Sequence, residues 1–194
     1  MTRTLNLALV LTAALLVGAA AAVTQQRYVL ADGSLFRIDG TSTLGRYSCI
    51  AGRIAGAGTV PEAGPASAEV TVGVASFDCG VSRMNRDFRN ALRAEEHPAI
   101  RFTLVDARTS GTEARPGAWV PVQVRGRLSL AGEERNVDIR AEGRRAGAGR
   151  VRIRGEHAMR MSDFGIDPPS GMMGAVRARD AITVRFELSA VVAD

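Results

Sequence analysis

The sequence predicts an all-β protein, a closed antiparallel barrel with one inserted helix. Three observations support this fold class. Apolar and polar residues alternate in seven or eight segments, as they do in strands with one buried and one solvated face. Segments rich in turn-forming residues, such as 131–134 and 143–149, separate these rows. One segment, residues 82–96, departs from the alternation and repeats its apolar residues at helical spacing.

Each alternating row places its apolar members on one face of a strand. An open sheet of this size would leave two unpaired edges exposed, so we expect the sheet to close on itself. In chain order, the apolar members of the rows are Phe36 and Ile38; Val70, Val72 and Val74; Ile100, Phe102 and Leu104; Val120, Val122 and Val124; Leu128 and Leu130; Val137, Ile139 and Ala141; Val151, Ile153, Met159 and Met161; and Ile182, Val184, Phe186 and Leu188.

The expected helix covers residues 82–96. Met84, Phe88 and Leu92 share one face, while charged residues occupy the others. Ser82 is predicted to cap the start of the helix, and Pro98 stands just beyond its end. A single helix among meandering strands predicts a lid or plug for the barrel.

The first 22 residues have the features of a secretory signal peptide. Arg3 precedes an apolar run from Leu7 to Val17, and small residues lead to Ala22, where we expect cleavage. The run is shorter than the roughly 20 residues of a membrane span, and no later segment is apolar enough to cross a bilayer. We therefore expect one domain, residues 23–194, in the periplasm or secreted, without stable membrane insertion.

The two cysteines, Cys49 and Cys79, predict a structural disulfide. An even pair in an exported chain is typical of a disulfide framework. The alternative is a reactive thiol, but the sequence has no C-x-x-C motif to favour it.

The basic character of the chain does not indicate a nucleic-acid partner. All 25 basic residues are arginine, which suggests a compositional bias, and most stand singly on the polar side of the strand rows. The aromatic residues that would stack against bases are not found beside them. We interpret the net charge of +5 as a solvated surface that also attracts anionic lipid headgroups weakly.

Nothing in the sequence marks a catalytic or metal site, and we expect no enzyme activity. The two histidines, His97 and His157, lack the spacing of a metal motif. No G-x-S-x-G elbow marks a nucleophile, so a hydrolase is a remote alternative. Asp163-Phe164-Gly165 matches one kinase motif, but the other kinase signatures are missing, and we interpret it as a turn.

Four segments, taken in order, resemble the YceI family of periplasmic lipid-binding proteins. They are Gly40-Thr41-Ser42-Thr43-Leu44; Cys79-Gly80 leading through Met84 and Ala91-Leu92 to His97-Pro98-Ala99-Ile100-Arg101-Phe102; Val124-Arg125-Gly126-Arg127-Leu128-Ser129-Leu130-Ala131-Gly132; and Met161-Ser162-Asp163-Phe164-Gly165-Ile166-Asp167-Pro168-Pro169. The resemblance implies an eight-stranded, lipocalin-like barrel that holds a polyprenol or a ubiquinone-like lipid, with no other cofactor. One departure is Gly45-Arg46-Tyr47, where a branch of the family continues with His-Asp-Trp.

Alternation by itself fits a packed core as well as a lined tunnel, and the resemblance favours the tunnel. The alternative function is a ligand-free structural or protein-interaction module of the cell envelope. Under the favoured hypothesis, the residues expected to line the barrel interior and contact lipid are Phe36, Ile38, Val72, Val74, Phe88, Leu92, Phe102, Leu104, Val122, Val124, Phe164, Met172, Met173, Val184 and Phe186.

Overall fold

The computed structural model describes residues 25–62, 64–109, 115, 117–147, 149–171 and 174–193. The expected signal peptide, residues 1–22, lies outside the described residues, as do Met172 and Met173. The described elements are β1 (Gln25–Leu30), β2 (Leu35–Ser42), β3 (Gly45–Ala51), β4 (Ile54–Pro61), β5 (Ser67–Gly73), η1 (Val74–Ser76), β6 (Phe77–Asp78), α1 (Ser82–Ala91), β7 (Ala99–Thr109), β8 (Val120–Leu130), β9 (Glu133–Arg145), β10 (Arg150–Arg160), η2 (Met161–Phe164), β11 (Ser170–Gly171) and β12 (Val176–Val192).

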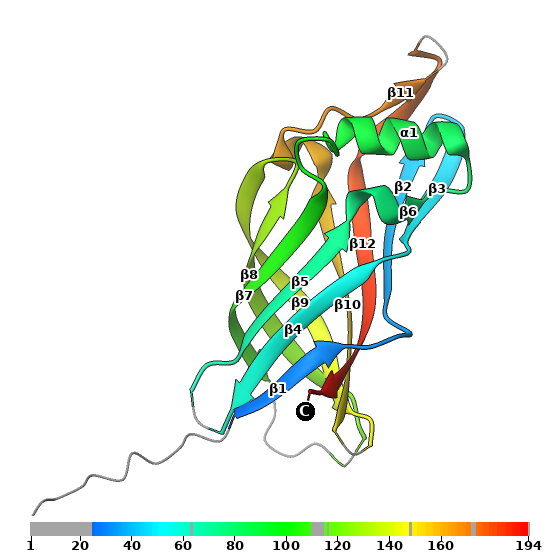
Figure 1. Cartoon of the computed structure of the whole chain (residues 1–194). Helices are drawn as coiled ribbons and strands as arrows, with labels where there is room; N and C mark the ends of the chain where they lie inside the picture. The colour runs from blue at the N-terminus through cyan, green and yellow to red at the C-terminus, as the bar shows by residue number, and fades with distance from the viewer. Residues whose placement is uncertain are drawn as a thin grey trace, which may run out of the picture.

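Eight antiparallel strands close into a barrel, as predicted (Figure 1). Their order around the barrel is β1-β4-β5-β7-β8-β9-β10-β12, and β12 returns to pair with β1. Closure leaves no free edge along this ring, which removes the main hazard of a large sheet. Within the described residues, none of the helices combines the length and the apolar character needed to span a bilayer.

Strands β2, β3 and β6 are not part of this ring order, and each of them continues the line of a ring strand. β12 pairs with β1 through Ala190 and with β2 through Glu187, so β1 and β2 follow one another along the same neighbour. In the same way β3 leads into β4 across the bend at Gly52, and β5 leads into β6 across η1. These interruptions explain why the first rows of the sequence alternate over shorter stretches than the later ones.

Helix α1 lies across one end of the barrel, and β1 and the C-terminal end of β12 lie at the other (Figure 1). The helix is shorter than predicted, because it ends at Ala91 and the chain turns through Arg93, which has a φ of 49°. The predicted cap is wrong: Ser82 is the first helical residue, and Val81 precedes it without a side-chain cap. The start is instead held by Asn85, whose Oδ1 accepts a hydrogen bond from the Cys79 N–H at 2.7 Å.

A cluster of buried residues lies beneath α1. Phe77 packs against Phe88 of α1 with the two rings tilted and their centroids 4.9 Å apart. The Cys49–Cys79 disulfide, present as predicted, ties β3 to the segment before the helix. The buried members of the cluster include Cys49, Val72, Val74, Phe77, Leu92, Leu130 and Phe164. We call this end, closed over by α1, the covered half.

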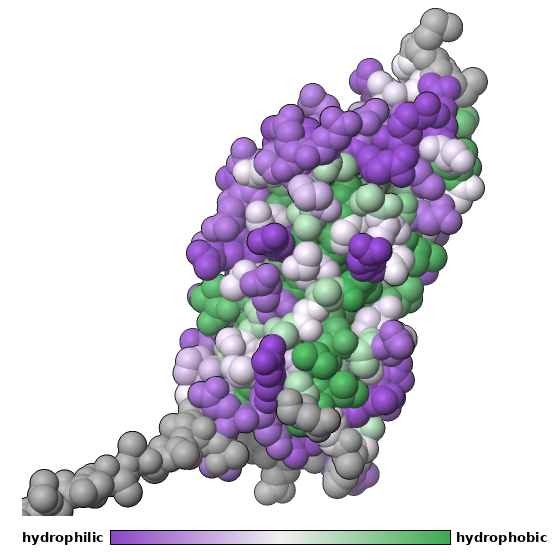
Figure 2. Space-filling view, viewed as in Figure 1, coloured by the Kyte–Doolittle hydropathy of each residue, from purple (hydrophilic) through white to green (hydrophobic). Residues whose placement is uncertain are grey.

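The end opposite α1 has a different interior, which we call the open half. Its inward rows include Val122 and Val124 of β8, Val151 of β10 and Leu188 of β12, and all four are only partly buried. Hydrophilic residues gather over α1, while hydrophobic residues are visible on the barrel face below it (Figure 2). The open half therefore leaves inward apolar side chains accessible.

Candidate ligand-binding cavity

A cavity of about 1580 Å³ runs through the barrel. It extends from Phe88 and Leu92 beneath α1 to Val60 and Arg145 at the opposite rim, and most of its wall is apolar. Pockets for drug-sized molecules commonly measure about 300–1,000 Å³, so this cavity suits a longer occupant. The interior of an eight-stranded barrel is either filled by side chains or large enough to hold one ligand. In this barrel the side chains leave a cavity.

Ten of the residues predicted to contact lipid lie on the cavity wall. They come from β2, α1 and the turn that follows it, β7, β8 and β12, so the wall is assembled from segments far apart in the sequence. These ten are Phe36, Ile38, Phe88, Leu92, Phe102, Leu104, Val122, Val124, Val184 and Phe186.

Three other predicted residues are buried but do not line the cavity. Val72, Val74 and Phe164 have exposed fractions of 2%, 1% and 2% and belong to the packed cluster of the covered half. Val74 lies in η1 and Phe164 in η2, where the chain leaves the strand conformation and the period-two row no longer sets the direction of a side chain. For Val74 and Phe164 this corrects the expectation that they face the bore. Val72 lies on the same face of β5 as Val70, which lines the cavity, but it is covered by the cluster.

Inward glycines keep the aromatic rings against the wall. The Phe102 ring lies directly over Gly126 on the neighbouring strand, where a Cβ atom would collide with it. In the same way a Cβ on Gly155 would come within 2.7 Å of Phe186 Cζ, the residue in register with it. Because the rings occupy the space of missing side chains, they stay out of the bore.

Gly45-Arg46-Tyr47, the segment that differs from the His-Asp-Trp of a branch of the family, also places an aromatic ring over a glycine. Tyr47 lines the cavity, and its ring covers Gly40, its register partner on β2. Burial raises the pKa of the Tyr47 phenol, so the group is neutral at ordinary pH. Tyr47 therefore offers the cavity a mostly apolar surface.

Sequence reasoning missed two features of the wall. One is a strip of small residues where β4 faces β5, including Gly56, Gly58 and Ala68. Its signal was the period-two spacing of Gly56 and Gly58, which alternation of large apolar residues does not detect. The second is His157, which continues the inward row of Val151 and Ile153 on β10.

His157 is a lone imidazole on an apolar wall. It is half-buried and in register with Val184, and among the described residues it takes part in no side-chain hydrogen bond or ion pair. Desolvation by burial lowers the pKa of His157 below its ordinary value of 6.5. The ring is therefore neutral at pH 7 and compatible with an apolar occupant.

His97 has a structural position instead. It packs against the Ala131–Gly132 turn between β8 and β9, and a Cβ on Gly132 would come within 2.6 Å of His97 Nε2. Ala131 and Gly132 both have positive φ, at 51° and 86°, which is the geometry of a two-residue hairpin turn.

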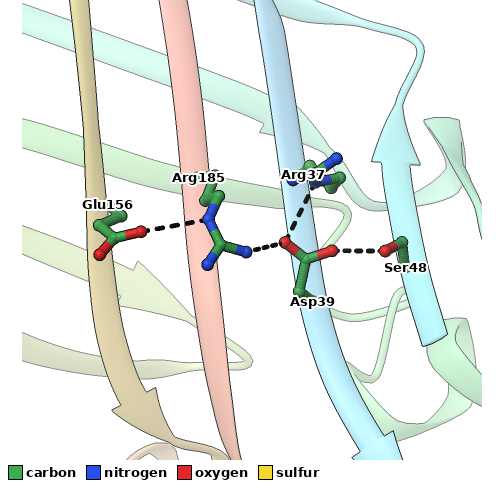
Figure 3. Close-up of polar contacts among 5 residues, drawn as sticks. All are labelled: Arg37, Asp39, Ser48, Glu156 and Arg185. Carbon is green, nitrogen blue, oxygen red and sulfur yellow. Dashed lines mark hydrogen bonds and ion pairs between the residues drawn. The ribbon is translucent and has the colours of Figure 1, made fainter. Parts of the chain in front are cut away.

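The polar residues of the outer face form ladders across strands. In the clearest one, Arg185 on β12 donates to Glu156 on β10 at 3.1 Å and to Asp39 on β2, and Asp39 also accepts from Ser48 on β3 (Figure 3). Arg37 Nε lies 3.1 Å from the Asp39 carboxylate. The ladder ties four strands together on the side away from the cavity.

Charge compensation controls the ionisation of Asp39. Partial burial by itself would raise the pKa of this carboxyl, but hydrogen bonds from Ser48 and Arg185, with the charges of Arg37 and Arg185, hold the pKa below its ordinary value. Asp39 is therefore a charged partner in an outer-face network. Within the described ranges, no group of three or more His, Cys, Asp or Glu residues is gathered as metal ligands would be.

A closed antiparallel barrel with a helix over one end and a long apolar cavity defines a lipocalin-like protein. The chain belongs to the YceI-like family, because the model of the YceI-like domain matches residues 30–190. A search of curated proteins found no significant match.

Solved structures with the same fold are distant in sequence. One is a polyisoprenoid binding domain from Saccharophagus degradans implicated in plant cell wall breakdown, with a TM-score of 0.68, 16% identity, and coverage of 86% of this chain and 98% of that one. Another is Burkholderia cenocepacia BcnA, with a TM-score of 0.66, 18% identity, and coverage of 80% and 95%. The Campylobacter jejuni YCEI protein has a TM-score of 0.52, 16% identity, and coverage of 66% and 73%.

Proposed function

We propose that this YceI-like protein is exported and holds an isoprenoid lipid, a polyprenol or an isoprenoid quinone, inside its barrel as a carrier or for sequestration. The observation that supports this most is the apolar cavity of about 1580 Å³. A long hydrocarbon chain gains roughly 0.8 kcal/mol for each methylene moved from water into such a site. Shape and apolarity are then sufficient for retention, with no covalent step.

Two further findings support the proposal. The Saccharophagus degradans domain of the same fold is described as polyisoprenoid binding. The Cys49–Cys79 disulfide suits an oxidising compartment outside the cytoplasm, in keeping with an N-terminal signal peptide.

The direct test is mass spectrometry of the protein purified from a native-like host, before and after extraction with organic solvent. We expect a lipid of isoprenoid mass in the extract and uptake of polyprenol or ubiquinone by the extracted protein. A protein that is repeatedly empty and takes up neither lipid would contradict the proposal and favour the structural or protein-interaction module.

A further inference from the structure

The cavity also opens to the surface beside the first turn of α1. Leu44 and Val81 both line the cavity, yet their exposed fractions are 76% and 54%. Leu44 lies in the turn between β2 and β3, and Val81 directly precedes α1. Among the large hydrophobic residues that the structure describes, these two have the highest exposed fractions. We call the opening between Leu44 and Val81 the side mouth.

The backbone pairing explains why the barrel wall is interrupted there. β3 pairs with β2 along residues 45–50, but on its other edge only its last two residues are paired, with β6. The Cys49–Cys79 disulfide links the two segments where this pairing ends, and the chain then turns toward α1 at Gly80, which has a φ of 80°. Within the described ranges, no strand covers residues 45–49 on this edge. The wall therefore has a gap between β3 and the start of α1.

The turn that carries Leu44 is fixed to the start of β12. The Thr43 N–H donates to the Arg177 carbonyl at 3.1 Å, and Thr43 Oγ1 donates to the Ala175 carbonyl, also at 3.1 Å. The Arg177 N–H in turn donates to Thr43 Oγ1 at 3.2 Å. The fold therefore holds Leu44 at the surface.

Arginines surround the side mouth. Arg46 and Arg83 line the cavity there, and Arg86 lies on the exposed side of α1. Arg177, whose backbone holds the turn, is also exposed. No ion pair in the described part of the chain includes Arg46, Arg86 or Arg177. The guanidinium groups of these three residues are available to an external anion.

The carboxylates near the side mouth do not cancel this charge. Asp87 Oδ2 lies 3.8 Å from Arg83 Nε, and Asp78 on β6 accepts hydrogen bonds from neutral donors. Glu95 and Glu96 follow the opposite end of α1. Because four arginines stand against two aspartates, the side mouth has a positive excess.

From this combination we propose that the side mouth docks on a bilayer containing anionic phospholipids and is where the lipid enters and leaves the barrel. The inference rests on the proposed function and adds the surface through which the ligand is exchanged. Leu44 and Val81 enter the apolar edge of the bilayer, while the arginines bind phosphates of the surrounding lipids. A long isoprenoid chain then passes from the membrane into the cavity without crossing water.

The composition of the side mouth fits a bilayer better than a protein partner. A stable protein interface buries about 1,200–2,000 Å² around an apolar centre. Here the exposed apolar groups are two side chains on separate elements with arginines beside them. A membrane interface requires only a few apolar side chains flanked by cations.

The first measurement is flotation of the protein with vesicles. Vesicles of phosphatidylcholine alone are compared with vesicles in which about a third of the lipid is phosphatidylglycerol. The protein is expected to float with the anionic vesicles, and salt should weaken this binding. The double variant Leu44→Ser/Val81→Ser should lower the partition coefficient at least about fivefold. Serine is favourable before a helix, so the change at Val81 is compatible with α1.

The matched control is Leu35→Ser/Val105→Ser. It makes the same two substitutions at residues that are 42% and 50% exposed and do not line the cavity. The control should keep wild-type binding to anionic vesicles. Melting curves check that both double variants fold; if Leu44→Ser/Val81→Ser does not, Leu44→Ser alone takes its place.

Two single variants test the charge and the end of the barrel. Arg46→Gln should weaken binding to anionic vesicles about fivefold, whereas Arg140→Gln, an exposed arginine on β9 away from the cavity, should not. Val60→Ser changes a 51% exposed residue at the opposite rim and should leave vesicle binding unchanged.

The second measurement is the rate at which delipidated protein takes up ubiquinone from anionic vesicles. Leu44→Ser/Val81→Ser should slow uptake at least about fivefold, because fewer molecules are docked. The amount of ubiquinone bound at equilibrium should match that of the wild type, since the barrel interior is intact.

The outcomes separate docking from lipid binding. Equal vesicle binding by the wild type and Leu44→Ser/Val81→Ser, or an equal loss in Leu35→Ser/Val105→Ser, overturns the side mouth as the docking surface. A loss in Val60→Ser alone places docking at the opposite rim and also overturns it. A wild type that takes up ubiquinone from detergent but ignores vesicles, or that cross-links through the side mouth to a protein partner instead, overturns docking and leaves the lipid barrel standing. A wild type that takes up no isoprenoid from vesicles or detergent overturns the proposed function itself.

Discussion

The two halves of the barrel share the same alternating strands but use the interior differently. In the covered half, the inward positions meet a second layer made of α1, η1, η2 and the disulfide, and residues such as Phe77 and Phe164 are almost fully buried. In the open half, Val122, Val124 and Leu104 also point inward but remain partly accessible, because they face the cavity.

The difference teaches what alternation determines. A period of two fixes which side chains face the inside of a closed sheet, and it applies equally to both halves. Whether the inside is solid depends on what else enters it. Here a helix covers one end, and glycines in the middle of β8 and β10 let the rings of Phe102 and Phe186 lie against the wall.

The largest expected contrast is in stability. Phe164→Ala removes a ring from the packed cluster and should reduce the free energy of unfolding by about 3–5 kcal/mol. Phe186→Ala removes the same group from the cavity wall, where one side of the ring has no packing partner, and should cost roughly half as much. Urea unfolding measures both, and equal losses would show that the two halves are packed alike.

The disulfide should matter more to the stability of the protein than to ligand uptake. It joins cysteines separated by 30 residues, which corresponds to about 3–4 kcal/mol in the chain-entropy model. The double variant Cys49→Ser/Cys79→Ser should therefore melt several degrees lower, since ~1 kcal/mol shifts a domain of this size by about 2–4 °C. Polyprenol uptake well below the melting temperature is the second measurement, and its loss would show that the open half depends on the disulfide.

Blocking the open half should affect the ligand more than the fold. Val122→Phe places a ring in the bore and is expected to abolish lipid retention while changing the free energy of unfolding by about 1 kcal/mol or less. The matched control is Val105→Phe on β7, because Val105 is 50% exposed and does not line the cavity. Extraction and mass spectrometry compare the two variants. Retention of lipid by Val122→Phe would place the ligand elsewhere.

The sequence predicted the closed barrel, the helix and the disulfide, because all three are encoded locally or in a pair of residues. Strand rows, helical spacing and a cysteine pair each carry their signal in the residues themselves. The direction of Val74 and Phe164 could not be predicted in the same way, since a single 3-10 turn ends the alternation without a distinctive sequence.

The part of the candidate site that lies on continuous strands could be predicted from alternation. The part where glycines, by lacking a side chain, make room for an aromatic ring could not. Phe102, Val122 and Phe186 belong to rows that alternation finds, and they line the cavity. The role of Gly126 depends on a ring of the neighbouring strand, so it requires the register between β7 and β8. Arg145 lines the cavity but lies in segment 143–149, whose turn-forming residues predict a hairpin turn and not the continuation of a strand row.

The smallest expected effect is a pH dependence from His157, an imidazole on the cavity wall. Its folded-state pKa lies below the ordinary value of 6.5 because burial disfavours the charged ring. The unfolded chain then binds more protons between the two pKa values. The contribution of neutral His157 to the free energy of unfolding is therefore fully present above pH 6.5, and it is lost as the pH falls from 6.5 through the folded-state pKa.

An apolar ligand desolvates the ring further, so retention should also weaken at mildly acid pH. Asp39 does not contribute in this window, because its pKa is held below 3.8. Melting curves and ubiquinone uptake between pH 7.5 and about 5 measure both effects, and His157→Gln should flatten the two profiles. If the wild-type profile is already flat, or if the slope persists in His157→Gln, the His157 imidazole does not cause a pH dependence of stability or of ligand uptake.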